Sequence, residues 1–372
     1  MKKLTTFASM LLISNISYAE TLVAEYFDPS VHQVYNVKIG EITNINERYK
    51  IYANGLMQAP IDVELDIMSN IGERVVLKNL IYKDGKPLIN IYLKSYGNQN
   101  GVLSEDQEHI SGWKISKIRN QYDNVLDGQE YDNNNDGSSS NYSMFYATSV
   151  STSPNELFCV KAGSYDSCKD ELDSYANVTA ISPRIYTSSD FQVNKHNTNW
   201  AGYPGHNRLG DSFLYELSLK KDGVHYIKDS YVIEPIHSQA THLSGMNILS
   251  QQAVSKNVLL GQDWNWNNTL IHFEQKEDEM KTWNLPYYGF WNDHTQYITE
   301  DIFHRKGVVS LYHIYGVVRV INSWKNEGVW GGSSAFFRNG EINMPLIVID
   351  NFGNKSSLFF KKDPNSKYFY LY

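Results

Sequence analysis

The most constraining feature of this sequence is a strict alternation of apolar and acidic residues between Ile61 and Ile67. Apolar side chains occupy every second position of this run, and Asp or Glu occupies the positions between them. Successive side chains of a β-strand point to opposite faces, so the run predicts a strand with one buried and one solvated face. Similar runs recur, separated by turn-forming clusters such as Lys83-Asp84-Gly85-Lys86. The pattern predicts an all-β fold with two β-sandwich-type domains.

The distribution of tryptophan and histidine divides the chain near Pro183. Seven of the eight Trp and nine of the eleven His follow this position. We therefore expect a signal peptide over residues 1–19, a first β-sandwich over 20–182 and a larger, aromatic β-rich domain over 183–372. A short helix is predicted for the second domain at 242–254, because that segment follows a Ser/Thr-rich break.

Three segments of the first domain carry a resemblance to a known family. Residues 52–60, 112–116 and 142–149 resemble immunoglobulin-like modules of secreted bacterial proteins, and the likeness covers roughly residues 25–182. It implies an antiparallel sandwich with a spacer or binding role. It implies no catalytic activity, because a fold of this kind does not by itself determine function.

The N-terminus has the parts of a bacterial secretory signal. Lys2 and Lys3 supply positive charge, an apolar stretch follows over residues 4–16, and Ala19 is the small residue before the expected cleavage. The stretch is shorter than the ~20 residues that cross a bilayer, so no integral membrane segment is predicted. We expect a secreted or periplasmic protein, and the sequence does not decide between these two compartments.

The overall charge and hydropathy exclude two classes of protein. A net charge of -8 gives no general attraction to nucleic acid, and a mean hydropathy of -0.45 excludes a polytopic helical membrane protein. The oligomeric state stays open.

The chain has two cysteines, Cys159 and Cys168, and both follow the expected cleavage site. In an oxidising compartment a close pair of this kind most often forms a disulfide. A free nucleophilic thiol is the alternative, but neither flanking sequence resembles the site of an activated thiolate.

One loop matches the first half of an EF-hand-type calcium loop. Asp132, Asn134 and Asp136 place oxygen ligands at alternate positions, and Gly137 permits the sharp turn. Ser143 stands where the bidentate Glu is required, so the match is incomplete. Calcium is the single cofactor that the sequence suggests, and an ordinary solvated loop is the alternative.

Histidines and carboxylates gather in the second domain. Acid–base or zinc chemistry requires such groups to converge, but no spacing here matches a known metal motif. Scattered structural histidines are therefore the alternative. The candidate catalytic residues are His206, Asp211, Glu234 and His237.

Aromatic and amide residues alternate in two segments of the second domain that we predict to be loops, 263–268 and 283–294. Aromatic rings can cover the C–H patches of a sugar while polar side chains bind its hydroxyls, although core packing is the alternative. Residues 368–372 also carry aromatic rings at alternate positions and predict a closing strand. The candidate binding residues are Trp200, Tyr203, Trp264, Trp266 and Trp291.

These observations support three hypotheses about function. The first is a secreted bacterial binding protein that recognises a glycan or another surface component through aromatic loops of the second domain. The second is a secreted hydrolase that uses the His/Asp/Glu-rich second domain. The third is a secreted toxin or host-interaction factor, which the export signal allows but no motif identifies.

Overall fold

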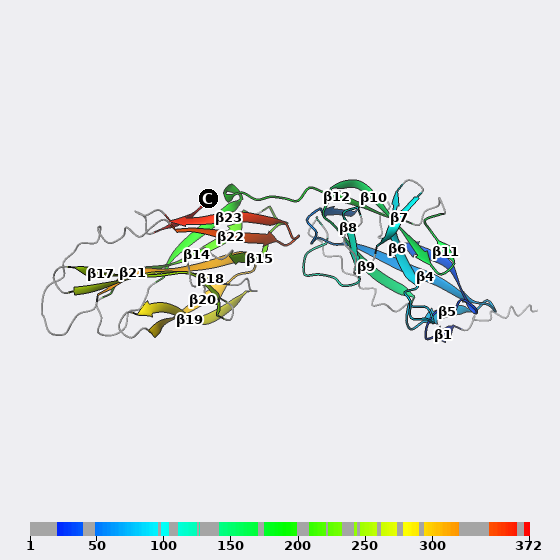
Figure 1. The fold of residues 1–372 in the computed structure, drawn as a ribbon, viewed down its shortest axis with the longest axis horizontal. Helices are drawn as coiled ribbons and strands as arrows, with labels where there is room; N and C mark the ends of the chain where they lie inside the picture. The colour runs from blue at the N-terminus through cyan, green and yellow to red at the C-terminus, as the bar shows by residue number, and fades with distance from the viewer. Residues whose placement is uncertain are drawn as a thin grey trace, which may run out of the picture.

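We analysed a computed structural model of the chain, which is drawn in Figure 1. The structure describes residues 21–39, 49–95, 98–103, 111–124, 126, 141–169, 175–198, 208–220, 222–232, 242–243, 246–258, 262–273, 278–289, 294–319, 342–362 and 368–372. Nearly all of these residues lie in or between β-strands, which confirms the predicted all-β class. In this part of the chain, no helix has the length and apolarity that crossing a membrane requires. The predicted signal peptide lies outside the described residues.

Residues 21–181, which we call the N-terminal half, form two six-stranded sheets. The first sheet contains β1 (Leu22–Ala24), β2 (His32–Ile39), β4 (Ala59–Ser69), β5 (Arg74–Leu77), β8 (Trp113–Ser116) and β9 (Tyr142–Ser149). The second contains β3 (Tyr49–Tyr52), β6 (Ile89–Ser95), β7 (Asn98–Leu103), β10 (Ser153–Ala162), β11 (Tyr165–Asp166) and β12 (Ala176–Ile181).

The alternating sequence of β4 explains how the first sheet packs. The apolar residues between Ile61 and Ile67 are fully buried, and the acidic residues between them are half-buried at the opposite face. Burying side chains of this size stabilises the fold by about 1.5–3 kcal/mol each. The ring centroids of Trp113 and Phe158, on β8 and β10, lie 5.1 Å apart and join the two sheets into one core.

Residues from 182 onward, the C-terminal half, form three sheets. The six-stranded sheet contains β13 (Phe191–Thr198), β14 (Arg208–Leu219), β16 (His242–Leu243), β17 (Met246–Val258), β18 (Gln262–Phe273) and β21 (Val308–Arg319). The four-stranded sheet contains β15 (Ile227–Val232), β22 (Ile342–Asp350), β23 (Lys355–Lys362) and β24 (Phe369–Leu371). The hairpin contains β19 (Glu279–Gly289) and β20 (His294–His304). A single turn of 3₁₀ helix, η1 (Ser188–Asp190), precedes β13.

These three sheets lie in layers, with the four-stranded sheet above the six-stranded sheet and the hairpin below it in Figure 1. Two adjacent residues of β18 show how the six-stranded sheet contacts both of its neighbours. The imidazole of His272 reaches the hydroxyl of Ser230 in the four-stranded sheet, with Nε2 and Oγ 2.9 Å apart. The ring of Phe273 instead contacts Trp283 in the hairpin, at 4.9 Å between ring centroids. Neighbouring side chains of one strand thus contact opposite layers.

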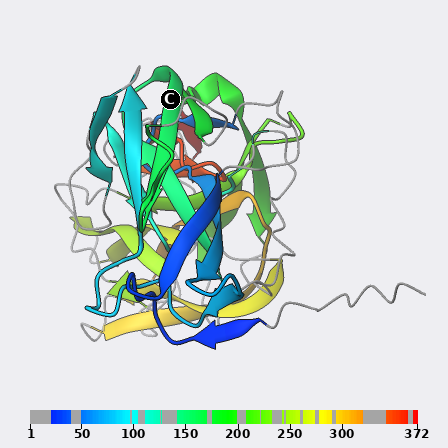
Figure 2. The same cartoon turned by 90° about the vertical axis from the view of Figure 1, so that its right-hand side faces the viewer.

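The described strands all pair within their own half, and the halves lie end to end (Figure 1). Figure 2 looks along this long axis, with the blue and cyan strands of the N-terminal half toward the viewer. The division near residue 183 and the resemblance to immunoglobulin-like modules stay predictions.

The prediction of a helix at 242–254 is wrong. Residues 242–243 form β16, and residues 246–254 lie in β17, which pairs with β18 from Met246 to Val258. The ladder to β18 supplies the backbone hydrogen bonds that a helix would otherwise make internally. Tertiary pairing has therefore overridden the local helix signal.

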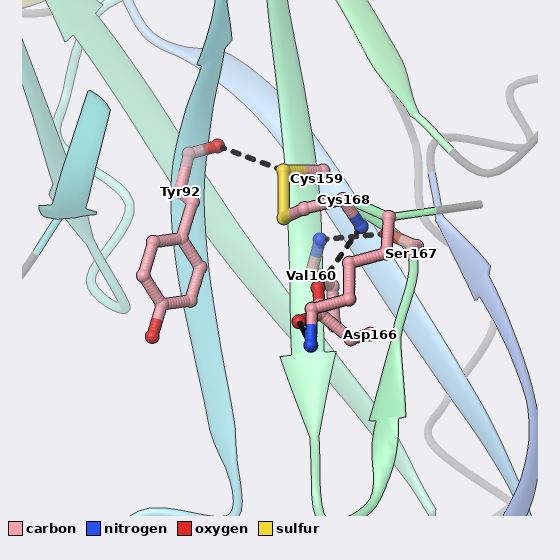
Figure 3. Close-up of a disulfide and its surroundings, with 7 residues drawn as sticks. Tyr92, Cys159, Val160, Asp166, Ser167 and Cys168 are labelled. Atoms are coloured by element: carbon pink, nitrogen blue, oxygen red, sulfur yellow. Dashed lines mark hydrogen bonds and ion pairs between the residues drawn. A yellow bond between two sulfur atoms is a disulfide. The ribbon is translucent and has the colours of Figure 1, made fainter. Parts of the chain in front are cut away.

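The predicted disulfide joins Cys159 on β10 to Cys168, just after β11 (Figure 3). Ser167 supports the turn, because its hydroxyl accepts a hydrogen bond from the backbone N–H of Val160 at 2.9 Å. The backbone N–H of Cys168 donates to the carboxylate of Asp166 at 3.2 Å. Closing so short a loop stabilises the folded state by about 2–3 kcal/mol in the chain-entropy description.

The turn between β22 and β23 connects the two halves. The side chain of Phe352 is fully buried in the core of the N-terminal half, although its strands belong to the other half. The side-chain amide of Asn54 donates to the carbonyl oxygen of Phe352 at 3.0 Å. The side-chain amide of Asn351 donates to the carboxylate of Asp123 at 2.7 Å, and the backbone N–H of Asp123 donates back to the carbonyl of Asn351 at 2.7 Å. We call residues 350–354 the junction turn.

Asp350 gives the junction turn its shape. Its carboxylate accepts hydrogen bonds from the backbone N–H groups of Phe352 and Asn354, at 2.9 and 2.8 Å. It also accepts the phenol hydrogen of Tyr186, 2.6 Å away. Gly353 has φ +84°, a conformation that L side chains rarely adopt, and a Cβ there would lie 2.5 Å from the Cβ of Leu56. The turn therefore fits against the N-terminal half without room for a side chain at Gly353.

Candidate functional site

The four-stranded sheet has one face that points away from the core. Its inward residues, among them Leu346, Leu358 and Phe360, are buried against the six-stranded sheet. Directly opposed residues of antiparallel strands share a face, so the strand register assigns the alternate residues to the outer face. The outward residues whose side chains the structure describes are Asp229, Tyr231, Pro345, Ile347, Ile349, Lys355, Ser357, Phe359, Lys361, Tyr370 and Tyr372.

Four aromatic side chains on this outer face are exposed to solvent, and we call them the aromatic face. Their exposed fractions are 38% for Tyr231, 37% for Phe359, 41% for Tyr370 and 67% for Tyr372. A ring left in water forgoes the stabilisation that burial would provide. Grouped exposed rings of this kind are typical of interaction sites.

The backbone pairing of β23 and β24 brings three of these rings together. Phe359 and Tyr372 exchange both backbone hydrogen bonds, at 3.2 and 2.8 Å, so they are directly opposed. Tyr370 lies two residues from Tyr372 on the same face, which separates their Cα atoms by about 7 Å. Lys361 is opposed to Tyr370 in the register. Lys361 therefore has neighbouring aromatic residues both on its own strand and on β24.

Two lysines lie over the aromatic face. The Nζ of Lys361 is 3.6 Å from the ring centroid of Tyr372 and 6.0 Å from that of Phe359. The Nζ of Lys355 is 5.1 Å from the ring centroid of Tyr231. A cation over a ring face is attracted by the π electrons. Neither ammonium forms an ion pair with any residue that the structure describes.

The N-terminal half covers the other end of the outer face. Tyr122 packs on Ile347 and Ile349 and buries both of them, with Leu56 at the edge of the cluster. Burial raises the pKa of the Tyr122 phenol. The aromatic face thus begins where the contact with the N-terminal half ends.

A second polar group of side chains lies on the other side of the six-stranded sheet. The buried carboxylate of Glu216 on β14 lies 2.8 Å from Nε2 of His196 and 3.3 Å from the guanidinium of Arg305. Ser310 is opposed to Glu216 on β21, and its buried hydroxyl has no hydrogen-bond partner among the described residues.

The hairpin adds a second carboxylate to this side of the sheet. Glu300 on β20 accepts a hydrogen bond from the phenol of Tyr312, and burial raises the pKa of the Glu300 carboxyl. Burial also raises the pKa of Tyr312 to about 12, and the same phenol lies 3.0 Å from the hydroxyl of Thr198. These groups hold the hairpin against the six-stranded sheet.

The structure describes one of the four predicted catalytic residues. His206, Glu234 and His237 lie outside the described residues, and Asp211 lies within β14, where its backbone pairs with Tyr315. A catalytic role for these four residues stays a prediction.

His225, another histidine of the C-terminal half, does have described contacts. Its Nδ1 is 2.8 Å from the carboxylate of Asp222, and its Nε2 is 3.2 Å from the hydroxyl of Tyr52. Because Tyr52 belongs to the N-terminal half, His225 contributes to the contact between the halves.

The expectation that the Trp-rich segments form loops is wrong for the parts that the structure describes. Trp264 and Trp266 lie inside β18, which pairs with β17 on one side and β21 on the other. Trp283 lies in β19 and is buried at 3% exposure. The Asn and Asp residues that suggested loops are accommodated in strands because both neighbours satisfy the backbone. Trp200, Tyr203 and Trp291 lie outside the described residues.

The calcium prediction is not tested, because Asp132, Asn134 and Asp136 lie outside the described residues. In the part of the chain that is described, no three His, Cys, Asp or Glu side chains are grouped so that they could hold a metal ion.

Comparison of the sequence with protein-family models and with curated proteins finds no match. The case for the aromatic face therefore rests on its geometry. Sequence reasoning missed it as a site, although the alternating rings of residues 368–372 correctly predicted the closing strand β24. Those rings, together with the exposed Phe359, were the signal that could have located it.

Proposed function

We propose that this protein is a secreted bacterial binding protein that recognises a glycan on the aromatic face. The observation that carries the proposal is the exposure of Tyr231, Phe359, Tyr370 and Tyr372 on one face of one sheet. The site differs from the predicted Trp-rich loops, but it lies in the same half of the chain and uses the same chemistry.

The composition of the aromatic face favours a sugar over a purely apolar partner. Ring faces suit the C–H patches of a pyranose, and three of the four rings carry a hydroxyl that can donate and accept hydrogen bonds. The aliphatic residue between them, Ile347, is buried at 2% exposure, so the accessible surface consists of separated rings beside Ser357 and the two lysines. A continuous aliphatic patch, as a lipid or a large protein interface would favour, is absent from these outward residues.

Two observations support the proposal of export. The N-terminal sequence has the pattern of a signal peptide. The disulfide between Cys159 and Cys168 is a bond that persists in oxidising compartments such as the periplasm or the extracellular space.

A glycan array probed with the chain lacking residues 1–19 tests the proposal, with titration calorimetry on the ligands found. We expect Tyr370→Ala and Tyr231→Ala each to weaken binding at least fivefold, which corresponds to about 1 kcal/mol of lost stacking. Tyr35→Ala is the matched control, because Tyr35 is 73% exposed on β2 in the N-terminal half, and it should bind as the wild type does. Absence of glycan binding by the wild type, or an equal loss in the control, would contradict the proposal. Binding of a protein or a lipid at the aromatic face, without binding of a glycan, would also contradict the proposal.

A further inference from the structure

Most of the charged side chains beside the aromatic face are positive, whereas the chain as a whole is negatively charged. The protein has a formal net charge of -8. Among the described outward side chains of the four-stranded sheet, however, two are lysines, Lys355 and Lys361, and one is a carboxylate, Asp229. Asp229 accepts a hydrogen bond from the backbone N–H of Ser230 at 2.8 Å, and it lies beside Tyr122 at the end that the N-terminal half covers. Asp229 and Lys355 are both opposed to Ile349 at that end, so among these side chains Lys361 is the charged one at the open end.

The position of Lys361 makes it the central charge of the site. It is opposed to Tyr370 in the register, and its ammonium lies over the ring of Tyr372 and within 6.0 Å of the ring centroid of Phe359. Three of the four rings that would stack on a sugar thus adjoin one cation. Among the described residues the Lys361 ammonium has ring contacts and no ion pair, so its three N–H donors can bind an anionic partner there.

Lys355 repeats this arrangement at the other side of the face. Its Cα is opposed to Ile349, yet its ammonium reaches over the ring of Tyr231. Each end of the aromatic face therefore combines an exposed ring with a lysine that forms no ion pair within the described chain. A charge-assisted hydrogen bond to an anionic group is stronger than the contact of an exposed ammonium with a ring.

Resting on the proposed function, we infer that the glycan is anionic. A carboxylate or sulfate of the bound saccharide accepts hydrogen bonds from Lys361, and the sugar rings stack on Tyr370 and Phe359. Lys355 binds a second anionic group beside Tyr231. The two lysines thus select acidic saccharides from neutral ones of the same shape, because a neutral sugar gains only the stacking contacts.

The test compares three probes of equal length by titration calorimetry: an oligogalacturonide, its carboxyl-reduced neutral counterpart and a heparin-derived sulfated oligosaccharide. We expect the wild type to bind at least one acidic probe at least tenfold more tightly than the neutral one. This preference should fall when NaCl is raised from 50 to 300 mM. The arm that binds more tightly identifies the anion as carboxylate or sulfate.

The variant Lys361→Gln and the double variant Lys355→Gln/Lys361→Gln test whether the lysines cause the preference for acidic probes. We expect Lys361→Gln to lose about tenfold in affinity for the acidic probe and less than twofold for the neutral one. Lys117→Gln is the matched control, because Lys117 also lies over a ring, that of Phe145 at 5.7 Å, but in the N-terminal half. Circular dichroism verifies the fold of each variant.

The outcomes separate this inference from the proposed function. Equal binding of acidic and neutral probes, abolished by Tyr370→Ala, overturns the anionic ligand and leaves glycan recognition standing. A preference for the acidic probe that survives in the double variant overturns the role of the lysines. Absence of binding to all three probes and to the array overturns both proposals.

Discussion

His272 shows how a single residue can make the stability of this protein depend on pH. It is fully buried between the six-stranded and four-stranded sheets, where its Nε2 lies 2.9 Å from the hydroxyl of Ser230. Burial disfavours the imidazolium and lowers the pKa of His272 to about 4 from its ordinary 6.5. The neutral ring is therefore the form that the folded state requires.

The consequence is a loss of stability as the pH falls from about 6.5 toward 4. In this window the unfolded state binds a proton that the folded state excludes, so acidification favours unfolding. We expect the proton uptake of His272 to lower the unfolding free energy by about 2 kcal/mol when the pH falls from 7 to 5. Urea denaturation at both pH values measures it. In His272→Gln the decline between the two pH values should be smaller by that amount, and an unchanged decline would assign the effect to other groups.

At the scale of the element, β23 separates structural from recognition residues by alternation alone. Phe360 is fully buried in a cluster with Tyr215, Leu311 and Phe369. Its neighbour Phe359 points outward and belongs to the aromatic face. One strand thus supplies the core with one phenylalanine and the surface with the next.

The two neighbours give a matched pair of variants. We expect Phe360→Ala to lower the unfolding free energy by about 3–5 kcal/mol, because it leaves a cavity in the core. Phe359→Ala should cost less than about 1 kcal/mol, since its ring is already in water. Thermal unfolding of both variants measures the difference. Similar losses would mean that the assigned strand register is wrong.

The same strands show how far sequence reasoning reaches. Alternation in residues 61–67 predicted a strand, and the spacing of Cys159 and Cys168 predicted a disulfide, because both signals are local. The aromatic face was not predictable, because Tyr231 joins Phe359 and Tyr370 only through the pairing of β15, β22, β23 and β24. Segment 242–254 was misassigned for a related reason, since its conformation depends on β18, its partner in the sheet.

At the scale of the whole molecule, the junction turn determines whether the two halves behave as one body. Phe352 lies in the core of the N-terminal half, and Asn351 and Asp123 bind each other through both side chain and backbone. We expect these contacts to couple the unfolding of one half to that of the other.

Gly353→Ala tests this coupling. The new Cβ would meet the Cβ of Leu56 at 2.5 Å, so the turn must withdraw from the N-terminal half. We expect the wild type to unfold in one calorimetric transition and the variant in two. Gly85→Ala is the control, because Gly85 has a similar φ of +81° with nothing within 4 Å of its Cβ position, and it should keep a single transition. Two transitions in both variants, or one in both, would contradict the coupling.

The junction turn also has a mechanical consequence. Strand β23 carries Phe359 and Lys361 and begins at the turn whose Phe352 is inserted between the N-terminal sheets. A force applied to a ligand on the aromatic face would therefore be transmitted along β23 to the junction turn. Under flow, a flexible linker would extend under such a force, whereas β23 and the junction turn transmit it directly to the core of the N-terminal half.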